Sequence, residues 1–331
     1  MKVPAERPGE SPERGVIAAF EQAFPGRLRA CYILGSYADA SAIGTSDLDL
    51  TVIFAGAFVS PDERDAARRL ASVCAAEAPT ELDIEIKDEE SLSQGVSPNL
   101  KLASAHIYGT DIRGQLPLIS LEAWTRDRMH SSWWRIARLF ARPAVIMPSL
   151  EYPEPTQPFL GYTRRTIRLA DGRLVPSTRD LIRLTGWAAT ALLALERGVY
   201  VAGKRDAHLL YHEHIGGPWD TFIADIYELC RARWSYLIPE NQEDRARLRE
   251  ICERTLLFER HFLARYNPYL IAELQSGDAH AREACEVMRR APLADAAVLR
   301  ELRCLEREGV DDVRAAARAA LAAYTSAEYP R

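Results

Sequence analysis

Two aspartates in the first part of the chain are the residues best suited to chemistry. Asp47 and Asp49 stand two positions apart in DLDLTVIF (residues 47–54), which begins in alternation and ends as a continuous apolar run. Such a run is typical of a strand buried on both faces, and residues two apart on a strand project from the same face. The two carboxylates can therefore share divalent cations, because Mg²⁺ and similar hard cations prefer oxygen ligands.

A glycine-serine turn is the second candidate feature. Gly35 and Ser36 directly follow the apolar segment 29–34, which predicts a strand. Glycine lets the backbone approach a ligand closely, and the turn would direct N–H groups, a helix N-terminus and one hydroxyl at a phosphate. We interpret the turn as a phosphate cradle, and we expect Ser46, directly before the first aspartate, to join the nucleotide-binding residues.

A third carboxylate would complete the cluster. The segment ELDIEIK (residues 81–87) alternates and predicts a strand with Glu81, Asp83 and Glu85 on one face, among which Asp83 is favoured because it lies mid-strand. Together with Asp47 and Asp49 it predicts a site for two Mg²⁺ ions, which about 3.5–4 Å apart would clamp the attacking and leaving oxygens of an in-line displacement. In this scheme Asp83 takes the proton of an acceptor hydroxyl.

The elements that position these residues follow from periodicity. Helices are predicted over 15–24, over 60–78 with a Ser60–Glu63 capping box, and over 124–139, before a proline-rich connection at 143–158. A hairpin turning at Asp171-Gly172 is predicted over 166–175. Later helices are predicted over 180–197 with Gly198 as C-cap, 206–214, 219–234 and 242–266, and at least two more end near 324.

These elements predict an α+β protein of 331 residues, which is more than one domain usually holds. We expect an N-terminal α/β catalytic domain with a small mixed sheet over residues 1–120. A connecting helix, proline-rich linker and hairpin would occupy 121–178. An all-helical bundle over 179–331 would bind substrate and nucleotide, with the reaction at the cleft between the α/β and helical domains.

Composition excludes several classes of protein. The apolar fraction of 47% and the charged fraction of 27% are those of a globular chain, not of a collagen-like or disordered one. The six cysteines are scattered without metal-ligand spacing, which favours reduced thiols. Residues 1–14 lack an apolar leader and no stretch is long enough to cross a bilayer, so we expect a cytoplasmic protein with no membrane partner. The net charge of −5 favours a small acceptor over long nucleic acid.

Together, the Gly35-Ser36 turn and the three aspartates resemble the signature of the nucleotidyltransferase superfamily that includes DNA polymerase β. With a helical C-terminal half, the chain is similar to the aminoglycoside (3″)(9)-adenylyltransferases, the streptomycin and spectinomycin resistance enzymes. The resemblance covers residues 32–86 and, more weakly, 180–245. It implies an adenylyltransferase that uses Mg²⁺ and ATP to modify a hydroxyl of a small acceptor, such as an aminoglycoside-type antibiotic.

The resemblance also implies nucleotide contacts in the C-terminal half. In that family a glycine after a helix precedes a Lys-Asp-Ala that faces the active site, and here GVYVAGKRDA, starting at Gly198, occupies that place. Either Lys204 or Arg205 would then neutralise the triphosphate. Tyr236 resembles the family's nucleotide-side tyrosine. The chain is considerably longer than those enzymes, through residues 121–177 and the tail after 266, so its acceptor pocket is expected to differ.

Two other functions stay open. The same chemistry could modify a macromolecule, either a tRNA 3′ end or a protein side chain as in toxin-like nucleotidyltransferases, and a cationic groove would favour that reading. Alternatively, the chain could be a non-catalytic, antitoxin-like partner that has kept the fold. The three intact aspartates count against the latter, because clustered like charges are costly to keep without a use.

Three weaker signals have ordinary explanations. The histidines of HLLYHEH (residues 208–214) suggest a metal site, but we favour surface or core histidines. Trp133 and Trp134, with neighbouring arginines, could stack on a base, but an apolar helix face opposite a charged one is favoured. The arginines around Asp171-Gly172 fit either a basic contact or an exposed ribbon.

Overall fold

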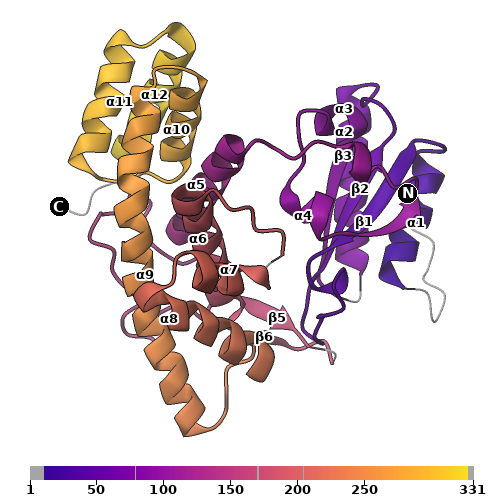
Figure 1. Ribbon diagram of the computed structural model, residues 1–331, viewed down its shortest axis with the longest axis horizontal. Coiled ribbons are helices and arrows are strands. Elements are labelled where there is room, and N and C mark those ends of the chain that lie inside the picture. Colours follow the sequence, from indigo (N-terminus) through magenta and orange to yellow (C-terminus); the bar gives the residue numbers. More distant parts are fainter. Residues whose placement is uncertain (1–10, 79, 170, 204, 327–331) are drawn as a thin grey trace. The chain divides into compact units, whose positions relative to one another are not determined.

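A computed structural model describes residues 11–78, 80–169, 171–203 and 205–326. The chain divides into two compact units, each assembled from several segments (Figure 1). The first unit comprises Met1–Trp124, Ile167–Leu174 and Tyr200–Asp206, and the second comprises Thr125–Thr166, Val175–Val199 and Ala207–Arg331. Within the described ranges, no helix combines the length and hydrophobicity needed to cross a bilayer.

A four-stranded mixed sheet in the order β3-β2-β1-β4 forms the centre of the first unit. Its strands are β1 (Leu28–Leu34), β2 (Leu48–Phe54), β3 (Leu82–Asp88) and β4 (Ala105–Gly109). β1 runs antiparallel to β2 and β4, whereas β2 and β3 are parallel and in register along their whole length. The predicted small mixed sheet is confirmed. β4 was not predicted, because five half-exposed residues carry too short a pattern to identify a strand.

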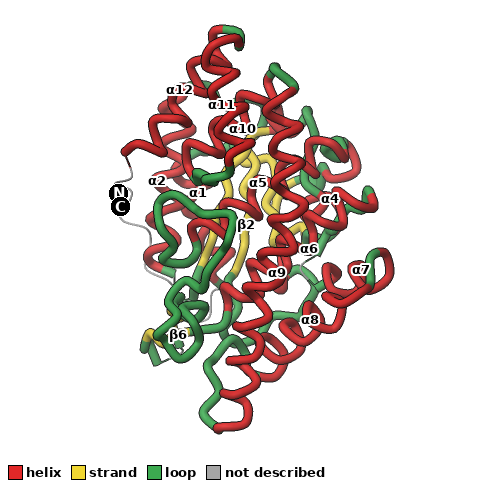
Figure 2. Tube along the Cα trace, turned by 90° about the vertical axis from the view of Figure 1, so that its left-hand side faces the viewer, coloured by secondary structure: helices red, strands yellow, loops and turns green. Residues whose placement is uncertain are grey.

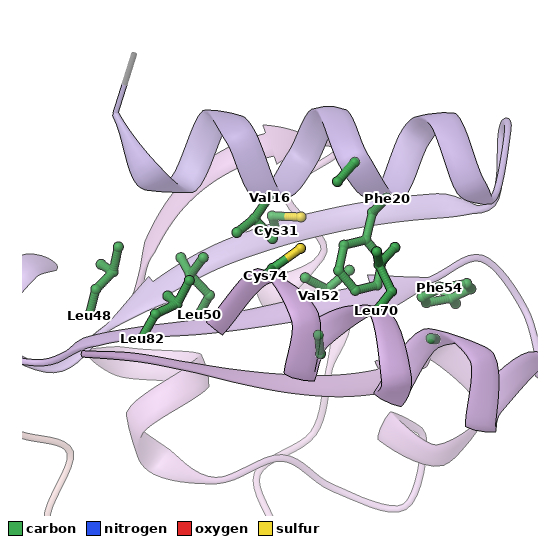
Figure 3. Packing of buried hydrophobic residues seen from close by; sticks show 13 residues of the cluster. Val16, Phe20, Cys31, Leu48, Leu50, Val52, Phe54, Leu70, Cys74 and Leu82 are labelled. Carbon is green, nitrogen blue, oxygen red and sulfur yellow. The ribbon is translucent and has the colours of Figure 1, made fainter. Parts of the chain in front are cut away.

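One face of the sheet is covered by α1 (Pro12–Ala23) and α2 (Pro61–Glu77). Figure 3 shows Val16 and Phe20 of α1 and Cys74 of α2 beside Cys31 and Val52 of the strands. α1 begins at Pro12 rather than at the predicted Gly15. α2 begins as predicted, since Ser60 Oγ accepts a hydrogen bond from the Glu63 backbone N–H over 3.1 Å.

The opposite face is covered by α3 (Glu89–Leu92), α4 (Pro98–Leu102) and the segment that follows them. Tyr32 and Ile53 of the strands pack there against Leu92, Leu100 and Ile112. Both faces of β2 are therefore buried along most of its length, as the apolar run predicts.

The second unit is helical apart from its share of the β5–β6 hairpin, of which Ile167–Leu174 belongs to the first unit. Its elements, in whole or in part, are α5 (Leu121–Arg138), β5 (Thr166–Arg168), β6 (Leu174–Pro176), α6 (Arg179–Arg197), α7 (Asp206–His214), α8 (Asp220–Asp225), α9 (Gln242–Gln275), α10 (Ala279–Arg290), α11 (Ala296–Glu308) and α12 (Asp311–Ser326) (Figures 1 and 2). The hairpin is confirmed, and Gly198 ends α6 in the left-handed conformation with φ of 65°. The predicted α+β class is confirmed.

Two predicted helices are wrong in extent. The segment 219–234 is not one α-helix: a 3₁₀ turn at Gly217–Trp219 leads into α8, and a π-helix (Ile226–Arg233) follows. α9 does not stop at Tyr266 but continues through Pro268 to Gln275. Tertiary packing outweighs the cost of that proline, because buried residues on both sides of it, such as Tyr266 and Leu270, hold α9 against α10 and α11.

The second unit has a mixed polar and aromatic interior. Trp133 is fully buried, stacks on Tyr266 with ring centroids 5.4 Å apart, and donates a hydrogen bond to the Ala291 carbonyl. It therefore belongs to the core, as the apolar-face reading expects. His130 lies next to it, 5% exposed, with Nδ1 3.0 Å from the Tyr266 hydroxyl. Burial lowers the pKa of His130 from 6.5 to about 4.

Replacing His130 should change how stability depends on pH. Between pH 6.5 and about 4, the unfolded chain takes up a proton on His130 that the folded chain excludes, so the free energy of unfolding falls as the pH is lowered. In His130→Gln this contribution, on the order of 3 kcal/mol across the window, should disappear. Urea unfolding at several pH values measures it. A His130→Gln protein that loses stability with falling pH as steeply as wild type would contradict the assignment.

Candidate active site

The register of β2 places the aspartate pair. Asp49 is the second residue of β2, and Asp47 lies one residue before the strand begins. Asp49 pairs with Leu34 at the end of β1 on one side and with Asp83 of β3 on the other. Register partners on adjacent strands point to the same face and lie about 4.8 Å apart across the ladder. Asp49 and Asp83 are thus neighbours, as the sequence predicts for two members of one cluster.

Gly35 brings the backbone directly against Asp49. It has φ of +66°, and a β carbon at this position would lie 2.8 Å from Asp49 Oδ2. A side chain is excluded both by the left-handed conformation and by the carboxylate. The spacing of the motif did not predict this contact. The expected helix N-terminus is wrong, since Gly35–Tyr37 form a short 3₁₀ turn whose Ala38 N–H returns to the Gly35 carbonyl over 3.0 Å.

Ser46 shapes the loop that leads into the aspartates. It is 5% exposed, its hydroxyl accepts a hydrogen bond from the Ile43 N–H over 3.0 Å, and its own N–H donates to the Ile43 carbonyl over 2.8 Å. Both groups close a tight turn directly before Asp47. The contacts of Ser46 therefore act on the backbone that positions Asp47.

The alternation of β3 distinguishes Asp83 from its two neighbours. Leu82, Ile84 and Ile86 join the core below α1 and α2, and the acidic residues lie on the opposite face as predicted. Asp83 is exposed and is the register partner of Asp49. Glu85 lies one step farther along, opposite Thr51, and forms an ion pair with Lys87 over 3.1 Å.

The carboxylates offer oxygen ligands of the kind that bind Mg²⁺ together with the phosphates of a bound substrate. Among the residues that the structure describes, no three His, Cys, Asp or Glu side chains converge to enclose a metal ion, so the protein alone does not assemble the predicted metal cluster of Asp47, Asp49 and Asp83. Mg²⁺ is commonly bound by one or two carboxylates together with substrate phosphates, and less often by a cage made of protein alone. Asp47 and Asp49, next to the Gly35 turn, fit that type of site.

A tyrosine on β1 supports the sheet from the face that carries the aspartates, and no motif identified it. Tyr32 Oη donates a hydrogen bond to Asp111 over 3.1 Å and accepts one from the Ile112 N–H over 2.9 Å. Arg113 pairs with the same Asp111 carboxylate over 2.6 Å and holds its pKa well below the ordinary value. This network ties the chain after β4 to Tyr32 of β1, three residues before Gly35.

One of the two candidate phosphate cations can be placed. Lys204 lies outside the described residues. Arg205 is exposed and belongs to the segment Tyr200–Asp206, which is part of the first unit together with the aspartates. Tyr200 anchors that segment there, since its hydroxyl donates to the Ile119 carbonyl over 2.6 Å.

Tyr236 belongs to the second unit and has an unusual backbone. It follows the π-helix with φ of +67°, after Ser235 with φ of +50°. Its N–H donates to the Cys230 carbonyl and its own carbonyl accepts from the Thr178 N–H, each over 2.7 Å. The Arg179 guanidinium lies 5.2 Å from its ring centroid. These contacts hold a conformation that a non-glycine residue rarely adopts.

The α7 histidines contact protein groups. His208 stacks on Tyr227 with centroids 4.5 Å apart, and His212 Nδ1 lies 2.7 Å from an Asp220 carboxylate oxygen, which raises the pKa of His212. His214 lies 4.0 Å from Glu213. Each contact suits a structural or surface role.

Comparison with solved structures finds a distant likeness. No protein-family model matches the chain, and no curated protein does. Among solved structures, the chain is similar to spectinomycin adenyltransferase AAD(9) from Enterococcus faecialis, whose crystal structure contains ATP and spectinomycin. The sequence identity is 14%, the match covers 76% of this chain and 98% of that one, and the TM-score is 0.41. At this distance the site must be judged from the residues of this chain.

Adding a methyl group at Gly35 should disturb the site. Gly35→Ala places a β carbon against Asp49 Oδ2 in a left-handed conformation, and we expect a loss of about 1–2 kcal/mol in the free energy of unfolding. Gly44→Ala is the matched control in the same loop, because its β carbon would meet no atom within 4 Å. Urea unfolding of both variants measures the difference, and equal stability would show that the approach of Gly35 to Asp49 is not a constraint.

Proposed function

We propose that this protein is a nucleotidyltransferase that moves AMP from ATP to a hydroxyl of a small acceptor. The observation that carries the proposal is the position of Asp49, which lies against the Gly35 turn on one side and beside Asp83 on the other. A backbone turn held against one of two neighbouring carboxylates suits phosphoryl chemistry, in which positioning and charge neutralisation supply most of the catalysis.

Each residue has a defined task in this proposal. The backbone N–H groups of the Gly35-Ser36 turn would bind the triphosphate, as successive backbone N–H groups of a turn do for anions. Asp47 and Asp49 would hold Mg²⁺, which when bound neutralises phosphate charge and activates a coordinated hydroxyl. Asp83, exposed beside Asp49, accepts the proton of the acceptor hydroxyl.

The transfer is an in-line displacement at the α-phosphorus of ATP. The acceptor oxygen forms a bond to that phosphorus, the bond from phosphorus to the oxygen bridging the α- and β-phosphates breaks, and pyrophosphate leaves with the electron pair. The acceptor proton goes to the Asp83 carboxylate. The products are an adenylylated acceptor and pyrophosphate.

A small acceptor is favoured over a nucleic acid by the charges of the hairpin region. Three arginines that could have contacted phosphates are paired with acids: Arg164 with Glu154 over 2.8 Å, Arg165 with Asp180 over 3.8 Å, and Arg173 with Asp171 over 2.7 Å. Paired arginines add little net positive potential for a polyanion. The net charge of −5 supports the same choice.

A mass-resolved transfer assay tests the proposal. Purified protein, Mg²⁺ and each nucleoside triphosphate are incubated with streptomycin, spectinomycin, a tRNA pool and a cell-extract protein fraction. A mass gain of one AMP on a small hydroxylated compound is the expected result. A product formed on tRNA or protein alone would replace the small-acceptor proposal with the macromolecular one.

Removing the charge of either β2 aspartate should abolish transfer. Asp47→Asn and Asp49→Asn keep the size of the side chain but lose a carboxylate ligand, and we expect kcat to fall roughly 100-fold or more. Asp65→Asn on α2 is the control. Asp65 is exposed, and its ion pair with Arg68 is long, at 3.9 Å, so its loss should have little effect. Full transfer by either β2 variant, with far-UV circular dichroism showing a normal fold, would rule out this site.

The general base can be assigned by comparing two residues of one strand face. Asp83→Asn should lower kcat by about 100-fold. Glu85→Gln, one step along β3 and paired with Lys87, should leave kcat unchanged. If Glu85→Gln lost activity while Asp83→Asn kept it, the base would be Glu85.

A further inference from the structure

The arginines of the last three helices are unevenly supplied with acidic partners. α10, α11 and α12 pack against one another at the end of the second unit (Figure 1). Of their eight arginines, five pair with an acid of these same helices: Arg282, Arg289, Arg300, Arg314 and Arg318. Within the described part of the chain, the guanidiniums of Arg290, Arg303 and Arg307 form no ion pair. Two of these three, Arg303 and Arg307, line one pocket.

This pocket lies between α11 and α12 and has a volume of about 440 Å³. Leu299 of α11 and Leu321 of α12 line it together with Tyr324, which is 7% exposed. The Tyr324 hydroxyl donates to the Leu293 carbonyl over 3.0 Å, so the polar end of this side chain already has a partner. Small-molecule sites typically measure about 300–1,000 Å³ and are lined mainly by apolar and aromatic side chains. The pocket therefore offers an apolar surface to the body of a small molecule.

The charged side chains of the pocket leave an excess of positive charge. Arg303 and Arg307 are exposed and stand four positions apart on α11, so they lie on the same face of the helix. Glu306 also lines the pocket, but its carboxylate pairs with Arg318 of α12 over 3.5 Å. Like charges four positions apart disfavour a helix, and an anion bound between them would remove that cost.

An apolar surface beside two unpaired guanidiniums fits a ligand that has both an apolar body and a carboxylate. Guanidiniums bind carboxylates through parallel, charge-assisted hydrogen bonds. A neutral ligand would leave these donors without an acceptor, and a wholly polar anion would leave Leu299 and Leu321 uncovered. We propose that the pocket between α11 and α12 binds a small amphiphilic carboxylate, with Arg303 and Arg307 holding the carboxylate group.

The site is independent of the proposed transfer reaction. All its residues belong to Ala207–Arg331 of the second unit, and none of them has a task in the reaction proposed above. Binding of a carboxylate can therefore be measured whether or not the protein transfers a nucleotide.

Calorimetric titration of the whole protein with three carboxylates tests the site. 2-Naphthoate, 4-phenylbutyrate and decanoate share the carboxylate and differ in the shape of the apolar body. At least one should bind saturably, with Kd on the order of 0.1–1 mM for a ligand of this size. The amide of the compound that binds keeps the apolar body without the charge, and it should bind about 10-fold more weakly or worse.

Two arginine variants and a matched control locate the binding. Arg303→Gln and Arg307→Gln keep a polar side chain but lose the guanidinium, so each should raise Kd about 5-fold or more. Arg290→Gln removes the third unpaired arginine, which is also exposed but does not line the pocket, and it should bind as wild type does. The comparison separates a contact with the ligand from the general loss of one positive charge.

A blocking variant tests the shape of the site. Thr325 is exposed and lines the pocket from α12, so Thr325→Trp fills the space while both arginines stay in place. Binding should be lost, whereas the far-UV circular dichroism and the melting temperature should stay near those of wild type.

Three results would each overturn the proposal. None of the three carboxylates binds in this range, the amide binds as tightly as its carboxylate, or Arg303→Gln and Arg307→Gln both bind as wild type does. Asp49→Asn should keep the binding, so a failure of the proposed catalysis would leave this readout intact.

Discussion

Burial of β2 on both faces is the constraint on which the site depends. From Leu50 to Phe54 the strand alternates between the core under α1 and α2 and the core under α3 and α4, and neither core accepts an unpaired charge. Asp47 and Asp49 are tolerated because they stand at the entry to the strand, where burial is incomplete. The apolar run therefore fixes where along β2 a carboxylate pair can lie.

Two turns convert that position into a site of defined shape. The left-handed Gly35 brings the backbone up to Asp49, and the hydrogen bonds between Ser46 and Ile43 close the loop that delivers Asp47. Both devices act on the backbone and fix the positions of the two carboxylates. Carboxylates that are held in place before a ligand binds are the preorganisation that phosphoryl transfer requires.

The second unit shows how tertiary packing handles unfavourable local features. Pro268 lies inside α9, and Tyr236 keeps a left-handed backbone held by two hydrogen bonds. Arg128 and Arg135 of α5 both stack on Trp187 of α6, with guanidinium carbons 3.9 and 3.3 Å from the ring centroid. In natural proteins strained backbone is often kept where a ligand is bound, and Tyr236 carries a ligand hypothesis here.

The sequence by itself determined the α+β class, the strands β1 to β3, the hairpin and the shared face of the acidic residues on β3, because these follow from local periodicity. Only the tertiary structure decided the pairing of Asp49 with Asp83, the contact of Gly35 with Asp49 and the meeting of Arg135 with Trp187. It also decided the π-helix and the length of α9. These features join residues far apart in the chain, or depend on packing that overrides local propensity, and no short-range pattern encodes them.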